Sequence, residues 1–304
     1  RDDLVTGVQT CALPISEILT PLSMTSTGFD YERITENVSL SFTATGSITE
    51  QVKYRDNPAL GLYSSVADLG HYMRMVLNEG KLNNDQYLTV KSIKNSFLSQ
   101  NRHVKLDHSF KVGLGWFLSD VGLDYNTTLA FHEGNAESFV SYIGLVPEYG
   151  LGVVALANTT SAESFLKRIS NRLLSLSIQT KTGLAPDRIA TKNLTETVQI
   201  PFSELQSYAG YYSSPAGVVK VVAVGSALKT QVGGKHFELV PGKDERFKIN
   251  YHVFPFLSVT SPELDLLDLK KTKKMGKDVV VIRYLGKEFL IGEHLKSKIG
   301  RAHV

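Results

Sequence analysis

The sequence has little of what would assign it to a membrane, a nucleic acid or a redox site. Its 304 residues include one cysteine and one tryptophan, and their formal net charge is +3. So small a charge does not predict a surface for nucleic acid or membrane lipid. The longest apolar runs, such as residues 151–157, are far shorter than the roughly 20 residues that cross a bilayer. We therefore expect a globular protein with one large core or two ordinary ones.

Metal and cofactor sites are not predicted either. The lysine-rich run at residues 270–277 is typical of a solvated hairpin. Several histidines have no acidic residue at ligand spacing, so we expect no metal ion and no other cofactor. These isolated histidines are His71, His103, His108, His236 and His252.

Both ends of the sequence resemble translated sequencing adapters. Residues 5–15, VTGVQTCALPI, match one reading of a short-read adapter, and residues 298–304, KIGRAHV, match the opposite orientation. We therefore assign residues 1–15 and 297–304 to adapter sequence and leave them out of the fold. This assignment removes Cys11 from any argument about disulfides or redox state. It also implies that the natural N-terminus, with any signal peptide, lies outside this sequence.

Residues 16–179 predict helices packed on an antiparallel sheet. Ser65 and Asp68 form a capping-box pattern ahead of an amphipathic helix that ends at Gly80, and a second helix is expected within residues 85–99. A long helix is expected over residues 161–178. Strands are predicted near residues 112–119, 128–133, 139–146 and 151–158.

The last third of the chain has a different pattern. Residues 180–202 lose periodicity and contain two prolines, which is typical of a linker. Residues 203–296 contain short strands between Gly, Pro and Asp, which favours a small antiparallel barrel or sandwich. The aromatic residues expected to fill its core are Tyr211, Tyr212, Phe237, Phe247 and Phe254. The predicted fold class is α+β, with a partial antiparallel sheet and packed helices followed by a small all-β barrel.

Several stretches occur in an order and spacing that resemble one family. They are ILTPLSM (18–24) with TGF (27–29), residues 58–68, GLGW (113–116), HEGN (132–135) and the strand pair within residues 139–158. Residues 16–179 thus resemble the C-terminal part of serine β-lactamase-like proteins, which include class C β-lactamases, penicillin-binding proteins and esterases. Residues 203–296 resemble the lipocalin-like barrel appended to many members.

The resemblance implies hydrolysis through an acyl-serine intermediate, with a Ser-x-x-Lys serine as nucleophile and a Tyr-x-Asn motif moving protons. Both motifs precede residue 18 in such proteins, and no Tyr-x-Asn occurs in this sequence. Ser164 with Lys167 and Ser226 with Lys229 have the Ser-x-x-Lys spacing but follow the matching stretches. The Lys-Thr-Gly at residues 181–183 is expected in the linker, away from any active-site strand. We therefore expect this chain to lack a nucleophile and to be inactive alone.

The resemblance places the third catalytic motif at HEGN. It implies that His132 replaces the family's lysine and binds substrate or moves a proton. It also implies that Gly134 lets substrate approach the backbone, and that the N–H of Asn135 forms half of an oxyanion hole. The residues alone equally allow a histidine in an ordinary strand and a glycine at a bulge. Trp116 is interpreted as a core aromatic, with a cleft wall as the alternative.

Two functions remain open at this point. The first is part of a serine hydrolase acting on an ester, an amide or a D-amino-acid peptide. The second is a non-catalytic ligand-binding or regulatory protein built on a hydrolase remnant and a barrel. The resemblance implies a small-molecule or peptide substrate and a periplasmic or secreted location, while the net charge and the short apolar runs predict no nucleic-acid partner and no membrane span. It leaves the substrate and the oligomeric state undefined.

Overall fold

The chain folds into two compact units. The computed structural model describes residues 14–29, 38–49, 60–104, 107, 109–136, 138–187, 196–214, 217–232, 234–254, 257–259, 267–284 and 287–295. The first, here called the sheet unit, comprises Arg1–Gln100 and Lys111–Arg188. The second, the barrel unit, comprises Asn101–Phe110 and Ile189–Val304. Of the residues assigned to adapter sequence, only 14 and 15 are described, and Ile15 is exposed.

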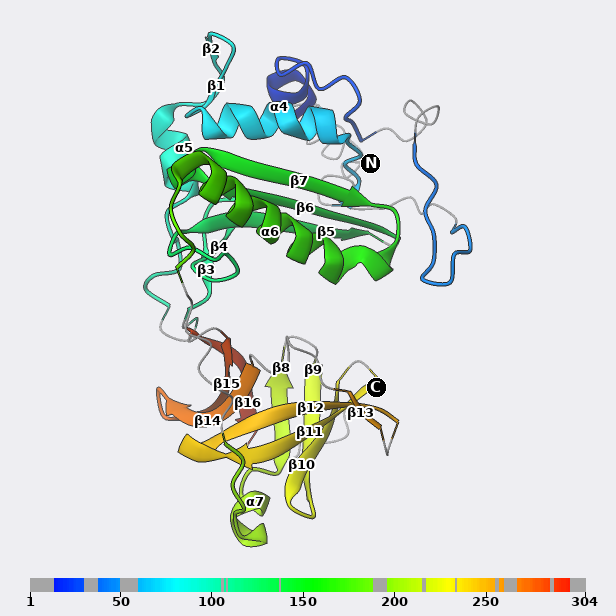
Figure 1. Cartoon of the computed structure of the whole chain (residues 1–304), viewed down its shortest axis with the longest axis vertical. Helices are drawn as coiled ribbons and strands as arrows, with labels where there is room; N and C mark the ends of the chain where they lie inside the picture. Colours follow the sequence, from blue (N-terminus) through cyan, green and yellow to red (C-terminus); the bar gives the residue numbers. More distant parts are fainter. Residues whose placement is uncertain are drawn as a thin grey trace, which may run out of the picture. The chain divides into compact units, whose positions relative to one another are not determined.

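Five antiparallel strands in chain order form the main sheet of the sheet unit (Figure 1). They are β3 (Lys111–Val112), β4 (Phe117–Ser119), β5 (Leu129–Ala136), β6 (Phe139–Val146) and β7 (Leu151–Ala157). A 3-10 turn at Pro147–Tyr149 joins the last two strands, and Gly150 completes it with a φ of 58°. The predicted meander is therefore confirmed.

The predicted amphipathic helix is also confirmed. It spans Val66–Leu77 (α4), and the Ser65 side chain accepts a hydrogen bond from the Asp68 N–H at 3.2 Å. The other long helix, α6 (Glu163–Thr182), crosses one face of the sheet (Figure 1). The remaining elements of this unit are η1 (Ile15–Leu19), β1 (Lys81–Leu82), β2 (Asp85–Gln86), α5 (Val90–Ser96) and η5 (Thr160–Ala162). No helix among the described residues is both long and apolar enough to span a bilayer.

The sheet separates two apolar cores. A Cβ at Gly152 would meet the Met73 sulfur of α4, whereas a Cβ at Gly144 would lie 3.3 Å from a Leu174 methyl of α6. The buried side chains of the α4-side core are Leu19, Leu22, Met24, Met75, Val76, Ile93, Trp116, Leu118, Ala130 and Leu145. Those of the α6-side core are Leu123, Tyr125, Leu129, Val146, Leu174 and Ile178. Trp116 is thus a core residue, as expected.

Two expected boundaries in the sheet unit need correction. The sequence predicts one strand over residues 112–119, but Gly113 donates its N–H to the Trp116 carbonyl at 2.8 Å and a turn separates β3 from β4. Gly115 takes a φ of 75° in this turn, which a residue with a side chain adopts only at a cost. The helix expected to end at residue 178 continues to Thr182, where Gly183 ends it in the left-handed conformation.

Eight of the strands described in the barrel unit close on themselves. In chain order they are β8 (Gly210–Ser214), β9 (Gly217–Val224), β10 (Ala227–Val232), β11 (Lys235–Gly242), β12 (Arg246–Phe254), β14 (Leu267–Lys274), β15 (Lys277–Tyr284) and β16 (Lys287–Leu295). Each pairs antiparallel with its neighbours, and β16 pairs with β8 to close the ring. A short strand, β13 (Leu257–Val259), pairs with β12 alone. The expected barrel is confirmed, and the lysine-rich run forms its β14–β15 hairpin.

Apolar side chains from all around the ring fill the barrel, and the short helix α7 (Phe202–Gln206) contributes Leu205. The buried members of this core are Leu205, Tyr212, Val221, Leu228, Leu239, Phe247 and Ile249. Phe237 packs partly buried against them, as expected. Tyr211 is exposed, because it alternates with Tyr212 on β8 and points away from the interior. The side chain of Phe254 lies outside the described residues.

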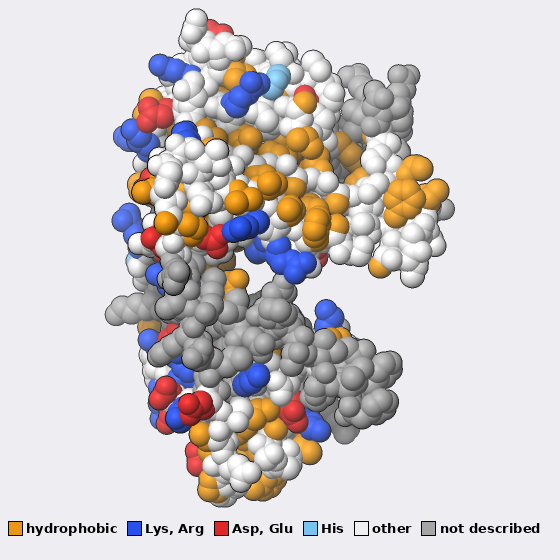
Figure 2. Space-filling view, viewed as in Figure 1, with side chains coloured by type: hydrophobic (Ala, Val, Ile, Leu, Met, Phe, Trp, Pro, Cys, Tyr) orange, Lys and Arg blue, Asp and Glu red, His pale blue; other side chains and the backbone are white. Residues whose placement is uncertain are grey.

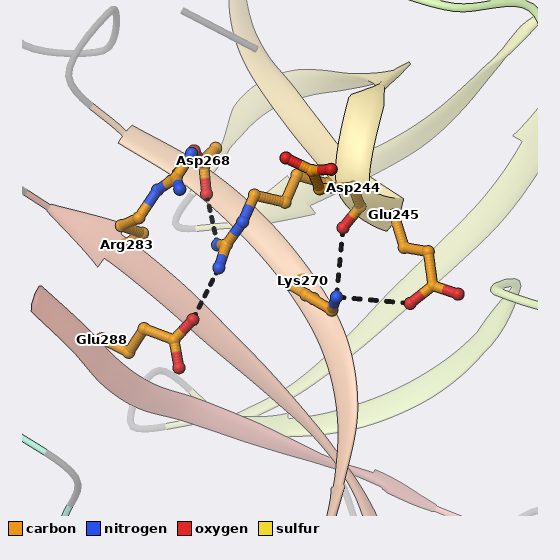
Figure 3. A network of polar contacts seen from close by, with 7 residues as sticks. Asp244, Glu245, Asp268, Lys270, Arg283 and Glu288 are labelled. Carbon is orange, nitrogen blue, oxygen red and sulfur yellow. Dashed lines mark hydrogen bonds and ion pairs between the residues drawn. The ribbon is translucent and has the colours of Figure 1, made fainter. Parts of the chain in front are cut away.

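Charged side chains on four adjacent strands form a network on the outer face of the barrel (Figure 3). Asp268 of β14 is buried and accepts from Arg246 of β12 at 2.7 Å and from the Arg283 Nε of β15 at 2.9 Å. Arg246 also donates to Glu288 of β16 at 2.6 Å. The segment between α5 and β3 reaches the same place, since the Ser109 N–H donates to the Glu288 carbonyl at 3.0 Å.

Candidate active site

The HEGN stretch lies on the second half of β5, where the strand has a partner on one side. Three residue pairs join β4 to β5, and the last of them is Phe117 with Phe131. Residues 130–136 all pair with β6 on the other side. Among the described residues, the β5 edge beyond Phe131 therefore has no strand partner. An extended ligand could hydrogen-bond to the backbone there.

His132 is exposed beside this edge. Its Nδ1 lies 2.9 Å from the Glu133 carbonyl oxygen, and its ring stacks on Phe117 with centroids 5.4 Å apart. A carbonyl oxygen only accepts hydrogen bonds, so Nδ1 carries a proton. In the neutral ring Nε2 is then the basic nitrogen, available to accept a proton or a hydrogen bond.

Gly134 lies opposite Ser141 of β6. A Cβ at Gly134 would collide with the Ser141 hydroxyl, so the space above this part of the strand is filled by a small polar group. Ser141 is a neighbour of the candidate site that the sequence analysis missed. Strand register alone brings it there, and no local sequence signal identifies it.

The Asn135 side chain faces the opposite way. Its amide donates to Glu163 of α6 at 3.1 Å, and the preceding Glu133 forms an ion pair with Lys167 of α6 at 2.8 Å. Strand alternation accounts for this division, because successive side chains point to opposite faces. Alternation thus separates the predicted site residues: Gly134 faces the α4 side, the Asn135 side chain faces the α6 side, and the His132 ring lies at the strand edge against Phe117.

The first two matching stretches meet each other. Thr27 donates to Asp68 at 2.7 Å and its hydroxyl lies 2.7 Å from that of Ser64. A backbone bridge joins Gly28 to Tyr63. These contacts hold Thr27 and Gly28 against the start of α4, which is a structural role.

The motifs that the sequence analysis set aside occupy other positions. Ser164 and Lys167 lie on α6, behind the sheet, where Lys167 is paired with Glu133. Lys229 lies on β10 of the barrel. Lys181 is in the last turn of α6 and donates to the Tyr149 carbonyl at 2.7 Å. The Lys-Thr-Gly sequence thus belongs to a helix end rather than to the expected linker, and it lies away from a strand in either case.

A small cavity of about 220 Å³ opens elsewhere in the sheet unit. Its lining residues are Phe97, Leu118, Thr127, Thr128, Ala130, Pro147 and Glu148. They adjoin the start of β5, and none belongs to the HEGN stretch. Within the described ranges, no three His, Cys, Asp or Glu side chains group as metal ligands.

Comparison with known proteins identifies the class to which this fold belongs. A family model described as Beta-lactamase matches residues 5–176, which is more than half of the chain. The chain therefore belongs to the beta-lactamase family, a family with a serine-hydrolase fold. The matched range includes residues 5–15, which the sequence analysis had set aside as adapter.

Individual relatives are distant and longer than this chain. Protein flp of Staphylococcus aureus strain NCTC 8325 is 25% identical over 148 residues, which are 47% of this chain and 28% of that protein. The crystal structure of SurE is similar with a TM-score of 0.59 and 14% identity, covering 94% of this chain and 63% of that one. The octameric penicillin-binding protein homologue from Pyrococcus abyssi has a TM-score of 0.48 and 18% identity, covering 92% and 59%. The chain spans less than a third of the flp protein.

Proposed function

We propose that this chain carries the third catalytic motif of a serine hydrolase that cleaves an ester, an amide or a D-amino-acid peptide. One observation carries the proposal: in the part of the chain that the structure describes, β5 has no strand partner on one edge beyond Phe131, and that edge bears an exposed histidine and a glycine. A strand edge of this kind can bind the extended part of a substrate through its backbone. Family membership supplies the reaction type.

In the proposed reaction, a serine hydroxyl from a segment outside this sequence attacks the substrate carbonyl carbon. The new C–O bond pushes the carbonyl electrons onto oxygen, and the Asn135 N–H donates to that oxyanion. The carbonyl then re-forms as the bond from its carbon to the alcohol or amine breaks. The serine proton passes through a base to that leaving group, and Nε2 of His132 is suited to carry it. Water then hydrolyses the acyl-serine by the same route.

The two Ser-x-x-Lys sequences in this chain are not the proposed nucleophiles. Ser164 is exposed on α6, on the face of the sheet opposite to the His132 side. Its partner by spacing, Lys167, is engaged with Glu133. Ser226 precedes β10, where side chains three positions apart point to opposite faces and share no surface. The chain alone is therefore proposed to be inactive.

The barrel favours a second candidate function, because eight strands in an up-and-down ring are the architecture of lipocalins. We propose that the barrel is a lipocalin-like module that binds a ligand. A protein whose only function was ligand binding in the barrel would have no use for the unpaired edge of β5, which favours the hydrolase. By family resemblance, we propose a periplasmic or secreted location for the complete protein.

A covalent probe tests the hydrolase proposal. The present chain should not react with a fluorophosphonate, whereas a chain preceded by a family upstream half with Ser-x-x-Lys and Tyr-x-Asn should. In that longer chain, His132→Ala should lower turnover roughly 10- to 1000-fold, as expected for loss of a proton carrier. Lys181→Ala is the matched control and should leave turnover unchanged. Loss of activity in Lys181→Ala with a silent His132→Ala would place the third motif at residues 181–183 instead.

A further inference from the structure

A line of polar residues on α6 holds β5 and β6 from behind the candidate site. Glu163, Lys167 and Asn171 follow one another at four-residue spacing, so they share one side of the helix. Each contacts a different residue of the sheet: Glu163 accepts from the Asn135 amide at 3.1 Å, Lys167 pairs with Glu133 at 2.8 Å, and Asn171 accepts from the Tyr142 hydroxyl at 2.8 Å.

The three contacts converge on the segment that carries the candidate site. Glu133 and Asn135 are the residues on either side of Gly134. Tyr142 lies directly opposite Glu133 in the β5–β6 register. The helix therefore contacts β5 at both positions flanking Gly134 and contacts β6 at the position opposite Glu133. These three contacts are here called the grip.

The contacts of the grip lie on the α6 face of β5, away from the proposed substrate. Glu133 and Asn135 point to α6, and alternation directs His132 and Gly134 to the other face. Fixing the odd-numbered side chains of β5 therefore fixes the rotation of the strand about its own axis. The directions of the even-numbered side chains and of the free backbone edge follow from that rotation.

The contacts between α6 and β5 are exposed to water, so their main consequence is the orientation of the strand rather than the stability of the fold. The Lys167 and Glu133 side chains are 49% and 41% exposed, and ion pairs so open to water stabilise a fold little. Lys167 also lies over the Phe131 ring, 5.1 Å from its centroid. This second contact restricts where the amino group can sit, and Phe131 is the last residue of β5 that pairs with β4.

We propose that Glu163 and Lys167 are positioning residues, which set the orientation of the β5 edge so that the Asn135 N–H and His132 meet a substrate. This inference rests on the proposed function for its purpose, but the grip itself can be tested without catalysis. It also gives Lys167 a role that its Ser-x-x-Lys spacing does not suggest.

The test measures the strand in the present chain. Amide chemical shifts and hydrogen exchange of residues 132–136 are recorded by NMR for Lys167→Met, which removes the charge and keeps a long side chain. We expect shifts at Gly134 and Asn135, and roughly three- to tenfold faster exchange of the amides bonded to β6, with melting temperature nearly unchanged. Lys167→Arg should restore the original spectrum, because a guanidinium can also pair with Glu133. Lys91→Met, at an exposed position of α5, is the matched control and should change nothing at β5.

Two results would overturn the proposal. One is an unchanged spectrum for residues 132–136 in Lys167→Met. The other is faster exchange spread over the whole sheet together with a lower melting temperature, which would make Lys167 a packing residue only. A confirmed local effect in a protein whose longer form never reacts with the fluorophosphonate would leave the grip standing and reject the hydrolase function.

Discussion

The two units differ in how the edges of their strands are paired. In the barrel, every strand except the short β13 has a neighbour on both sides, because β16 pairs with β8 and β11 with β12. Among the described residues of the sheet unit, β3 and β7 end the main sheet, and β5 is half unpaired. A closed ring satisfies its backbone hydrogen bonds internally, whereas an open strand keeps them available to another molecule. The candidate site lies in the unit that remains open.

The outer surfaces of the two units also differ, because one carries a charged network and the other an apolar stripe. On the barrel, the described outer face of β12 and β14–β16 carries the Asp268 network. On α6, an apolar stripe faces solvent: Phe165 is 55% exposed, Ile169 37%, Leu173 47% and Leu176 41%. Figure 2 shows hydrophobic side chains gathered over this helix. A patch of this kind is unusual on a self-sufficient domain.

The largest expected effect comes from separating the units. Residues 196–296 should fold alone with one cooperative thermal transition, because the ring closes within them and Val198 already bonds to the Pro241 carbonyl of β11. Residues 16–179 should unfold at a lower temperature, over a broader transition, and bind the dye ANS, because apolar surface stays exposed. Calorimetry and dye fluorescence measure both. A barrel fragment with no cooperative transition would remove the contrast between the units.

The next prediction tests what the charged network contributes to the barrel. Asp268→Asn leaves Arg246 and Arg283 facing each other without a carboxylate between them, in a place largely shielded from water. Breaking a buried ion pair on one side should lower the free energy of unfolding by about 3 kcal/mol. Urea denaturation of residues 196–296 measures it. Glu293→Gln, which breaks the exposed pair with Lys277, should cost under about 1 kcal/mol, and equal losses would refute the burial argument.

A pair of glycine substitutions separates a structural glycine from a site glycine within the sheet unit. A Cβ at Gly113 would overlap the backbone carbonyl of Ser96, which cannot rotate away, so Gly113→Ala should destabilise the unit by about 2 kcal/mol. Gly134→Ala meets only the Ser141 hydroxyl, which can change rotamer, so the cost should stay below about 1 kcal/mol. Denaturation of the full chain gives both values. The reverse order would mean that Gly134, and not Gly113, is the structural glycine.

The smallest expected effect concerns alkaline pH and the barrel core. Burial, and next the Asp278 carboxylate, raise the pKa of Tyr212 to about 12, and its hydroxyl donates to the Tyr208 carbonyl at 2.6 Å. A raised pKa means that the folded state favours the neutral phenol. Its contribution is complete below pH 10 and is lost as the pH rises toward 12, amounting to up to about 2 kcal/mol.

Tyr212→Phe should therefore flatten the loss of stability between pH 10 and 12, as followed by urea unfolding of residues 196–296. Tyr211→Phe, at the exposed neighbouring position, serves as the control and should keep the original slope. Identical slopes for all three proteins would show that the Tyr212 phenol does not titrate with unfolding.

Local signals predicted most of the elements correctly. Ser65 caps α4 as expected, because a cap needs only a hydroxyl three residues before an N–H. The capping box itself was half wrong: the Asp68 carboxylate bonds to Thr27, 41 residues away, instead of returning to Ser65. The pattern did not predict the turn at residues 113–116, because Leu114 and Trp116 are apolar like strand residues. Gly113 and Gly115 allow the chain to reverse its direction there.

The sequence by itself determined the family, the order of helices and strands, and the change from a mixed unit to an all-β unit. These follow from side-chain periodicity and turn residues, which act over a few positions. Only the tertiary structure decided that β16 closes on β8, that Ser141 lies over Gly134, and that Glu163 and Lys167 hold the strand behind His132. Such contacts join residues far apart in the chain. Strand register and helix packing bring them together, and neither is written in any local pattern.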